Sequence, residues 1–163
     1  MIFVVLGTQK FQCNRLLRQI DELMEEGKIT ETVFAQRGHS DYEPVHFPYA
    51  DFLPKEEFEK KIAACDILIT HSGVGTILAG VNRHKPVIVF PRLKKYKEHV
   101  DNHQLDIARA FQKKKRVLRC DEYDKLDELI SKSRDYEFST YQSQRERMIE
   151  LIDTYLREEI THV

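Results

Sequence analysis

The sequence has little that would mark a secreted, membrane-spanning or nucleic-acid-binding protein. Its cysteines, Cys13, Cys65 and Cys120, are widely spaced and form no C-x-x-C pair, which fits a reduced cytosolic compartment with buried thiols. The net charge of −1 argues against nucleic acid as a main partner. No apolar run approaches the ~18 residues that span a bilayer. The apolar start, residues 1–6, has no basic region before it, so we expect a buried strand and no signal peptide.

Motifs of several enzyme classes are also missing. The fingerprint G-x-G-x-x-G does not follow the first apolar run, which counts against a nicotinamide enzyme, and the P-loop pattern of nucleotide hydrolases is absent. His99 and His103 are four residues apart, a spacing that can ligate zinc. However, H-E-x-x-H is absent and no cysteine lies nearby, so we expect no metal and no cofactor.

What is present is the pattern of one α/β domain. The chain has 163 residues, of which 41% are hydrophobic, enough for a core of its own. The apolar runs predict strands, without the alternation of a half-exposed sheet, at 1–6, 32–36, 45–49, 66–70, 87–90 and 117–119. Between and after them the pattern predicts helices at 11–26, 55–64, 76–81, 98–111, 123–131 and 141–159, with an irregular stretch at 134–140.

One strand runs directly into a loop with two glycines. Residues 66–70 are followed by H-S-G-V-G-T, residues 71–76, and then by a helix. Gly73 and Gly75 can take positive φ and let a ligand approach the main chain closely, while Ser72 or Thr76 can cap the helix. A helix N-terminus of this kind suits a diphosphate. The alternative, a plain turn without a ligand, stays open.

The next strand end adds polar groups. Pro91 ends the strand at 87–90, and a basic loop leads into E-H-V-D-N-H-Q, residues 98–104. Two consecutive strands therefore deliver groups that could bind phosphate and ribose to one edge of a sheet, which is where open α/β folds bind ligands.

These segments, in this order and spacing, resemble the glycosyltransferase family 28 C-terminal domain, the donor-binding half of GT-B glycosyltransferases. The resemblance is closest to small chains that carry this half alone, including those of capsule and exopolysaccharide assembly, and it covers residues 1 to about 111. It implies a Rossmann-like parallel sheet flanked by helices, a single GT-B C-terminal half. All of 1–163 would then be one nucleotide-sugar-binding domain.

The resemblance also implies roles for individual residues. Donor-binding roles fall on Gly7, Thr8, His71, Ser72, Gly73, Val74, Gly75, Thr76, Arg92, Asp101, His103 and Gln104. Catalytic roles fall on His99, near the transferred sugar, and on Glu98. Many relatives hold the ribose with a glutamate where this chain has Ala79. Asp101 or Glu98 must then supply the carboxylate, or Gln104 and Asn102 hold the ribose.

By the same resemblance, the function is inverting, metal-free transfer of a hexose, with galactose favoured, from a UDP-sugar to a polyprenyl-diphosphate-linked saccharide. The chain has residues for one domain, so we expect a membrane-anchored partner glycosyltransferase chain to supply the acceptor half, giving a heterodimer at the inner face of the membrane. The segment 141–160 would pack on its own domain or dock to that partner. The alternative is a non-catalytic nucleotide-sugar-binding chain that augments another transferase.

Overall fold

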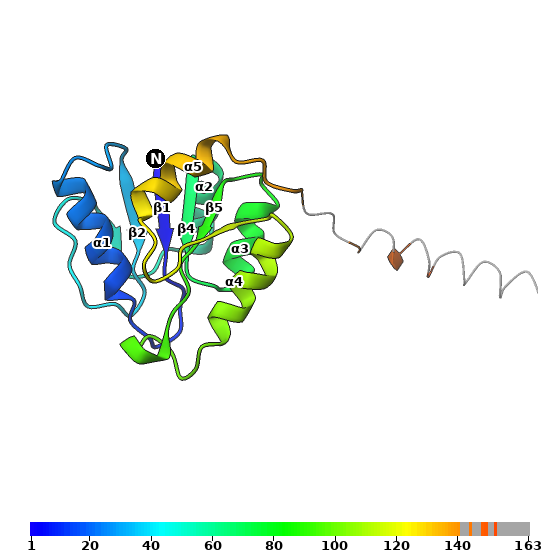
Figure 1. Ribbon diagram of the computed structural model, residues 1–163, viewed down its shortest axis with the longest axis horizontal. Coiled ribbons are helices and arrows are strands. Elements are labelled where there is room, and N and C mark those ends of the chain that lie inside the picture. Colours follow the sequence, from blue (N-terminus) through cyan, green and yellow to red (C-terminus); the bar gives the residue numbers. More distant parts are fainter. Residues whose placement is uncertain (141–143, 145–147, 150–151, 153–163) are drawn as a thin grey trace, which may run out of the picture.

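A computed structural model describes residues 1–140, 144, 148, 149 and 152 (Figure 1). Within these residues the strands form one parallel sheet in the order β3-β2-β1-β4-β5-β6. The strands are β1 (Ile2–Val5), β2 (Val33–Gln36), β3 (Tyr49–Ala50), β4 (Ile67–Thr70), β5 (Val87–Val89) and β6 (Leu118–Arg119). This is the Rossmann strand order, so the predicted fold class is confirmed.

Helices cover both faces of the sheet (Figure 1). They are α1 (Asn14–Glu25), α2 (Lys55–Ala64), α3 (Val74–Val81), α4 (His103–Lys113) and α5 (Leu126–Asp135), with a 3-10 turn η1 at Lys94–Tyr96. Ile2 and Val4 of β1 pack in a core cluster with apolar residues of α1 and α5. Phe3 and Val5 pack in a second cluster with residues of α2, α3 and α4. Because successive side chains of a strand point to opposite faces, covering both faces requires the continuous apolar runs seen in the sequence.

The third strand is shorter and later than predicted, because an aspartate binds the backbone that precedes it. Asp21 of α1 is buried, and its carboxylate accepts hydrogen bonds from the Val45 N–H at 3.0 Å and the His46 N–H at 2.8 Å. These two amides are therefore occupied away from the sheet, and Val45 is 81% exposed. Pairing with β2 begins only at Tyr49, so the prediction of a strand at 45–49 was wrong in position.

Three helices, α1, α4 and α5, start later than the sequence pattern predicted, whereas α3 starts at Val74 and not at residue 76. α1 begins at Asn14 and not at residue 11, and α5 runs from Leu126 to Asp135 and not over 123–131. α4 begins at His103 and not near 98, because Lys97 takes a left-handed conformation (φ 57°) and Asp101 accepts a hydrogen bond from the His103 N–H. The predicted C-terminal segment 141–160 lies almost wholly outside the described residues. Among the described helices, none has the length and apolar character needed to cross a bilayer.

The centre of the sheet is where its strand order reverses. β1 pairs with β2 on one side and with β4 on the other, and β5 follows beyond β4. Successive crossovers therefore leave the sheet in opposite directions at β1 and β4. In this arrangement the loops after the two strands separate and leave a crevice at the carboxyl edge.

Candidate functional site

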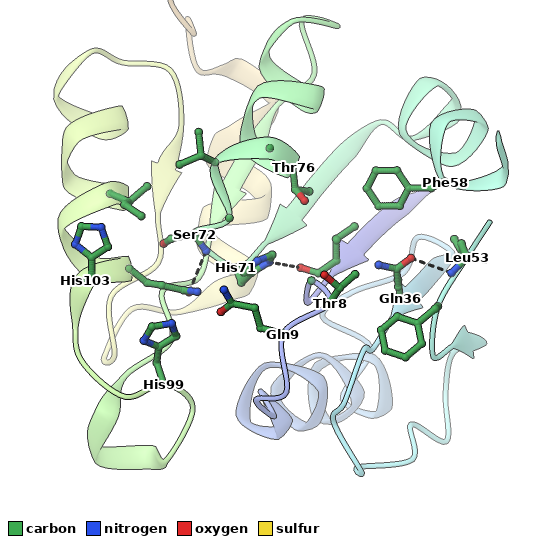
Figure 2. Close-up of a pocket in the computed structure, with 18 of the residues that line it drawn as sticks. Thr8, Gln9, Gln36, Leu53, Phe58, His71, Ser72, Thr76, His99 and His103 are labelled. Atoms are coloured by element: carbon green, nitrogen blue, oxygen red, sulfur yellow. Dashed lines mark hydrogen bonds between the residues drawn. The ribbon is translucent and has the colours of Figure 1, made fainter. Parts of the chain in front are cut away.

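A cavity of about 690 Å³ opens at this crevice (Figure 2). Its size lies within the range of small-molecule sites. Its walls come from the segments that follow β1, β2, β3, β4 and β5. The lining residues are Val5, Gly7, Thr8, Gln9, Gln36, Phe52, Leu53, Lys55, Phe58, His71, Ser72, Gly73, Val74, Gly75, Thr76, His99, His103, Gln104 and Ile107.

His71 forms the floor between the loops after β1 and β4. Its Nδ1 lies 3.3 Å from the carbonyl oxygen of Val5 (Figure 2). Burial, and then the positive charge of Arg92, lower the pKa of His71 to about 4. The ring is therefore neutral at pH 7. Because a carbonyl can only accept, Nδ1 carries the proton and Nε2 keeps its lone pair.

Only glycine fits at two positions beside this ring, because the imidazole lies too close to the backbone to leave room for a Cβ atom. A Cβ on Gly7 would lie 2.6 Å from Cε1 and Nε2 of His71, and Gly7 also has a φ of 75°. A Cβ on Gly73 would also clash with His71 Nε2. Gly73 has φ −74°, so it does not use the left-handed conformation open to glycine, and the missing Cβ is what its position requires. The imidazole packs directly on both loops and fixes their spacing.

The first amides of α3, at residues 74–76, have no hydrogen-bond acceptor among the described residues. Gly73 is the N-cap of α3, and among the described residues no side chain caps the helix, so neither Ser72 nor Thr76 takes the capping role that the sequence allows. Ser72 Oγ is buried and has no hydrogen-bond partner among the described residues. A Cβ on Gly75 would meet no atom within 4 Å, so the space in front of this turn is open. Gly75 lies in the helix and its φ is not positive.

Gln104 joins the ends of two strands. Its Oε1 accepts hydrogen bonds from the Ser72 N–H at 3.2 Å and the Arg92 N–H at 3.1 Å. The residue lines the cavity, as predicted for a donor-binding group, but its carbonyl oxygen is occupied within the protein. Only its amide NH₂ group is left for a ligand.

Of the two candidate histidines beside the cavity, His99 is held by neighbouring side chains, and His103 stands at the start of a helix. His99 lies in the loop before α4, with its ring 4.9 Å from the ring of Phe11 and its Nδ1 3.1 Å from Oδ1 of Asp101. His103 is the first residue of α4 (Figure 2). Asp101 is exposed and is not among the lining residues, and its bonds to the His103 N–H and to His99 lower the pKa of its carboxyl.

Among the described residues no cluster of three or more His, Cys, Asp or Glu could hold a metal.

Two predicted site residues lie behind the cavity wall. Glu98 is fully buried, and its oxygens accept from Arg15 at 3.0 and 2.9 Å and from the Leu93 N–H at 2.9 Å. Arg92 is fully buried too and donates to the carbonyl of Leu6. Neither lines the cavity, so the structure does not bring the predicted Glu98 carboxylate or Arg92 guanidinium to a ligand. Ala79 packs against a core cluster, and no Asp or Glu is among the described lining residues.

The sequence pattern missed one end of the cavity. Gln36, Phe52, Leu53 and Phe58 line it from the segments after β2 and β3 and from α2, and the Leu53 N–H donates to Gln36 Oε1 at 3.0 Å (Figure 2). Phe52 remains 47% exposed although it is a large apolar residue. The available signal was positional, since these residues follow parallel strands and must reach the same edge as His71.

Fold and site together define a class. A parallel sheet of Rossmann order, with a helix start and close-packed glycines at its switch point, is an arrangement common among nucleotide-binding and phosphate-binding α/β domains. The sequence model of the glycosyltransferase family 28 C-terminal domain matches residues 1–154, and the chain belongs to this family. The resemblance inferred from the sequence is thereby confirmed.

Individual relatives agree with the family. The chain is 36% identical over 75 residues to the UDP-N-acetylglucosamine transferase subunit ALG13 of Candida albicans (strain SC5314 / ATCC MYA-2876), a match that covers 46% of this chain and 22% of that protein. The fold is similar to that of the glycotransferase of kitacinnamycin, with a TM-score of 0.56, 16% identity, and coverage of 82% of this chain and 34% of that one. It is also similar to MurG of Acinetobacter baumannii, with a TM-score of 0.52, 16% identity, and coverage of 79% and 39%. The matches thus span less than half the length of each relative.

Proposed function

We propose that this chain is the donor-binding, catalytic subunit of a two-chain inverting glycosyltransferase, which transfers a hexose from a UDP-sugar to a polyprenyl-diphosphate-linked saccharide. The observation that carries the proposal is the set of unused hydrogen-bond donors at the switch point. The first amides of α3 are uncapped, Ser72 Oγ has no partner among the described residues, and no described lining residue is acidic. A diphosphate is an acceptor-only dianion that such a wall fits.

The donor diphosphate would lie over residues 73–76. The start of an α-helix carries about half a positive charge, and its interaction with an anion contributes roughly 0.3–1 kcal/mol, more where water is excluded. The open space at Gly75 lets phosphate oxygens approach these amides. The base and ribose would extend toward Phe52, Leu53 and Phe58, where the cavity offers apolar and aromatic surface.

Catalysis would need a base and stabilisation of the leaving group. The acceptor oxygen bonds to C1 of the sugar, the bond from C1 to the β-phosphate oxygen breaks, and UDP leaves with its negative charge held by the α3 amides. We assign the base to His99, whose Nδ1 lies 3.1 Å from the Asp101 carboxylate; with that nitrogen as the donor, Nε2 takes the proton of the acceptor hydroxyl. Glu98, predicted as catalytic, instead anchors the loop through Arg15 and Leu93.

The acceptor half would come from a membrane-anchored partner chain, which would hold this chain at the inner face of the membrane. The relative in Candida albicans is described as a subunit, which supports this assembly. Its name specifies UDP-N-acetylglucosamine, whereas the resemblance to small chains of bacterial exopolysaccharide and capsule synthesis favours galactose. The lack of a ribose carboxylate in the lining favours the alternative, a non-catalytic nucleotide-sugar-binding chain.

A reconstituted transfer assay tests the proposal. The chain, combined with its candidate partner chain and a polyprenyl-diphosphate saccharide, is supplied with UDP-galactose, UDP-glucose or UDP-N-acetylglucosamine. We expect transfer only with both chains, a fall of about 10²–10⁴ in kcat for His99→Gln with UDP binding retained, and no transfer with Gly73→Asp, which forces a charged side chain onto His71. Arg109→Gln, outside this cavity, is the control. Equal rates with wild type and Gly73→Asp, or activity of the partner alone, would leave this chain without a catalytic role.

A further inference from the structure

Behind the cavity wall lies a buried arginine cluster, consisting of Arg15, Arg92, Glu98 and Cys13. The side chains of Arg92, Glu98 and Cys13 are fully buried, and Arg15 is partly buried. Arg92 donates from Nη2 to the Leu6 carbonyl, while its Nε and Nη1 have no oxygen acceptor among the described residues. The Cys13 sulfur beside it is only a weak acceptor. A fully buried guanidinium that is so poorly satisfied calls for an explanation.

The charges of this cluster do not cancel. Glu98 binds Arg15 through both oxygens, and Arg15 also lies over the rings of Phe90 and Tyr96, at 4.2 and 4.6 Å from their centroids. Arg92 therefore has no carboxylate of its own. Burial raises the pKa of the Cys13 thiol to about 12, so the thiol is neutral at pH 7. Two arginines and one glutamate leave one excess positive charge, which is unfavourable in a buried position unless an anion balances it.

The cluster touches the cavity wall at two places. Leu6, the acceptor for Arg92, directly precedes Gly7 of the lining. The Arg92 N–H shares the Gln104 oxygen with the N–H of Ser72, which also lines the cavity. The charge of Arg92 reaches the cavity, since it contributes to the lowered pKa of His71.

We infer that the excess charge of the buried arginine cluster, carried by Arg92 behind the ends of β1 and β5, stabilises the bound diphosphate through space without touching it. This inference rests on the proposed function. Groups buried behind a binding wall act in a low-dielectric medium where salt screens them little, so the effect persists at high ionic strength. It also gives the sequence-predicted Arg92 a role that its position outside the cavity permits.

Calorimetric titration of the full chain with UDP and with uridine tests this inference, because uridine has the same base and ribose without phosphate. The variants change the charge of the cluster and leave the lining intact: Arg92→Gln and Arg15→Gln bring it to zero, Glu98→Gln raises it, and Arg92→Lys conserves it. We expect UDP affinity to fall about 10-fold in the first two, equivalent to about 1.4 kcal/mol. It should rise in Glu98→Gln and stay within about threefold in Arg92→Lys. Uridine affinity should stay within about twofold in all variants. The ranking of the variants by UDP affinity should be the same in 0.5 M salt.

Three outcomes would overturn the inference, and they are distinguishable. Parallel loss of UDP and uridine affinity would mean that the cluster only supports the fold. UDP affinity that does not follow the charge, with wild type binding UDP, would refute this inference alone. Failure of wild type to bind UDP would refute it together with the proposed function. If Arg92→Gln does not fold, Glu98→Gln still decides, because unchanged or weaker UDP binding in that variant contradicts the expected rise.

Discussion

Two cavities lie at the same edge of the sheet, and they use their polar groups differently. The cavity at the β1 and β4 ends has one cationic side chain, Lys55, in its lining, and its Ser72 hydroxyl and α3 start are unsatisfied. A second cavity of about 500 Å³ lies between the loop after β5, α4 and the segment after β6. It is richer in cations, with Arg15, Lys95, Arg109 and Arg119 among its lining residues.

The cations of the second cavity are paired with carboxylates, although the buried Nε of Arg119 has no hydrogen-bond partner among the described residues. Lys95 pairs with Glu122, Arg119 pairs with Asp121 at 2.8 Å, and Arg15 pairs with Glu98 at 2.9 Å. An anion that entered there would have to compete with these carboxylates. The contrast teaches that the number of basic side chains does not identify the anion site in this fold. What sets the switch-point cavity apart from the second one is a lining without an acidic side chain among the described residues, next to a Ser72 hydroxyl that has no partner there.

The largest expected effect concerns the neutral histidine beneath the first cavity. The native pKa of His71 is about 4, below the ordinary value of 6.5. Between these values the unfolded chain binds a proton that the native protein excludes, so stability is complete above about pH 6.5 and falls as the pH drops toward 4. For this group the loss between pH 7 and pH 5 is about 2 kcal/mol.

Urea unfolding at pH 7 and pH 5 measures this loss. His71→Gln is the control, because it keeps every other titrating group and lacks this one. The free energy of unfolding of wild type should fall by about 2 kcal/mol more than that of the variant. Equal falls would mean that the ring beneath the loops is not held neutral by the fold.

The next prediction tests whether a ligand occupies the open space beside Gly75. Gly75→Ala places a methyl group where no protein atom lies within 4 Å. Alanine is the better helix former, so the unliganded protein should gain up to about 1 kcal/mol of stability. The same methyl group occupies space that a phosphate needs, so UDP affinity should fall about 10-fold, or about 1.4 kcal/mol. Thermal melting with and without UDP measures both, and a variant that binds UDP as tightly as wild type would place the ligand elsewhere.

The smallest effect belongs to the second cavity. Lys95→Gln removes an exposed ion pair with Glu122, which solvent screens, so the stability of the fold should change little. Because this lysine already has a carboxylate partner and lies outside the first cavity, UDP affinity should change by less than about twofold. A loss as large as that of Gly75→Ala would reverse the assignment of the two cavities.

The sheet and its helices were largely predictable because each depends on a local apolar pattern. The range of α2, 55–64, was predicted to the residue, and β1, β4 and β5 lie within their predicted apolar runs. β3 was misplaced because the Asp21 carboxylate, distant in sequence, binds the amides before it. No periodicity in the segment itself contains that information.

The site residues were predictable in the loop that directly follows β4. They were less predictable after β5, where the chain turns back on itself. Residues 71–76 line the cavity as expected, yet the reason for Gly73 is the ring of His71 and not its φ angle. Glu98 and His99 are neighbours in sequence, but the turn at residues 94–97 sends one into the core and the other to the cavity. Such a division depends on tertiary packing, which a single sequence pattern does not encode.

The central claim is that the amides at the start of α3 bind the diphosphate of an activated sugar. Titration of ¹⁵N-labelled chain with UDP, followed by backbone amide NMR, tests it most directly, with uridine as the matched ligand without phosphate. The account predicts that UDP, and not uridine, shifts the amide resonances of residues 73–76, while both ligands shift those of Phe52 and Leu53. Shifts confined to residues around Lys95 and Arg119, or identical shifts of residues 73–76 with both ligands, would contradict it.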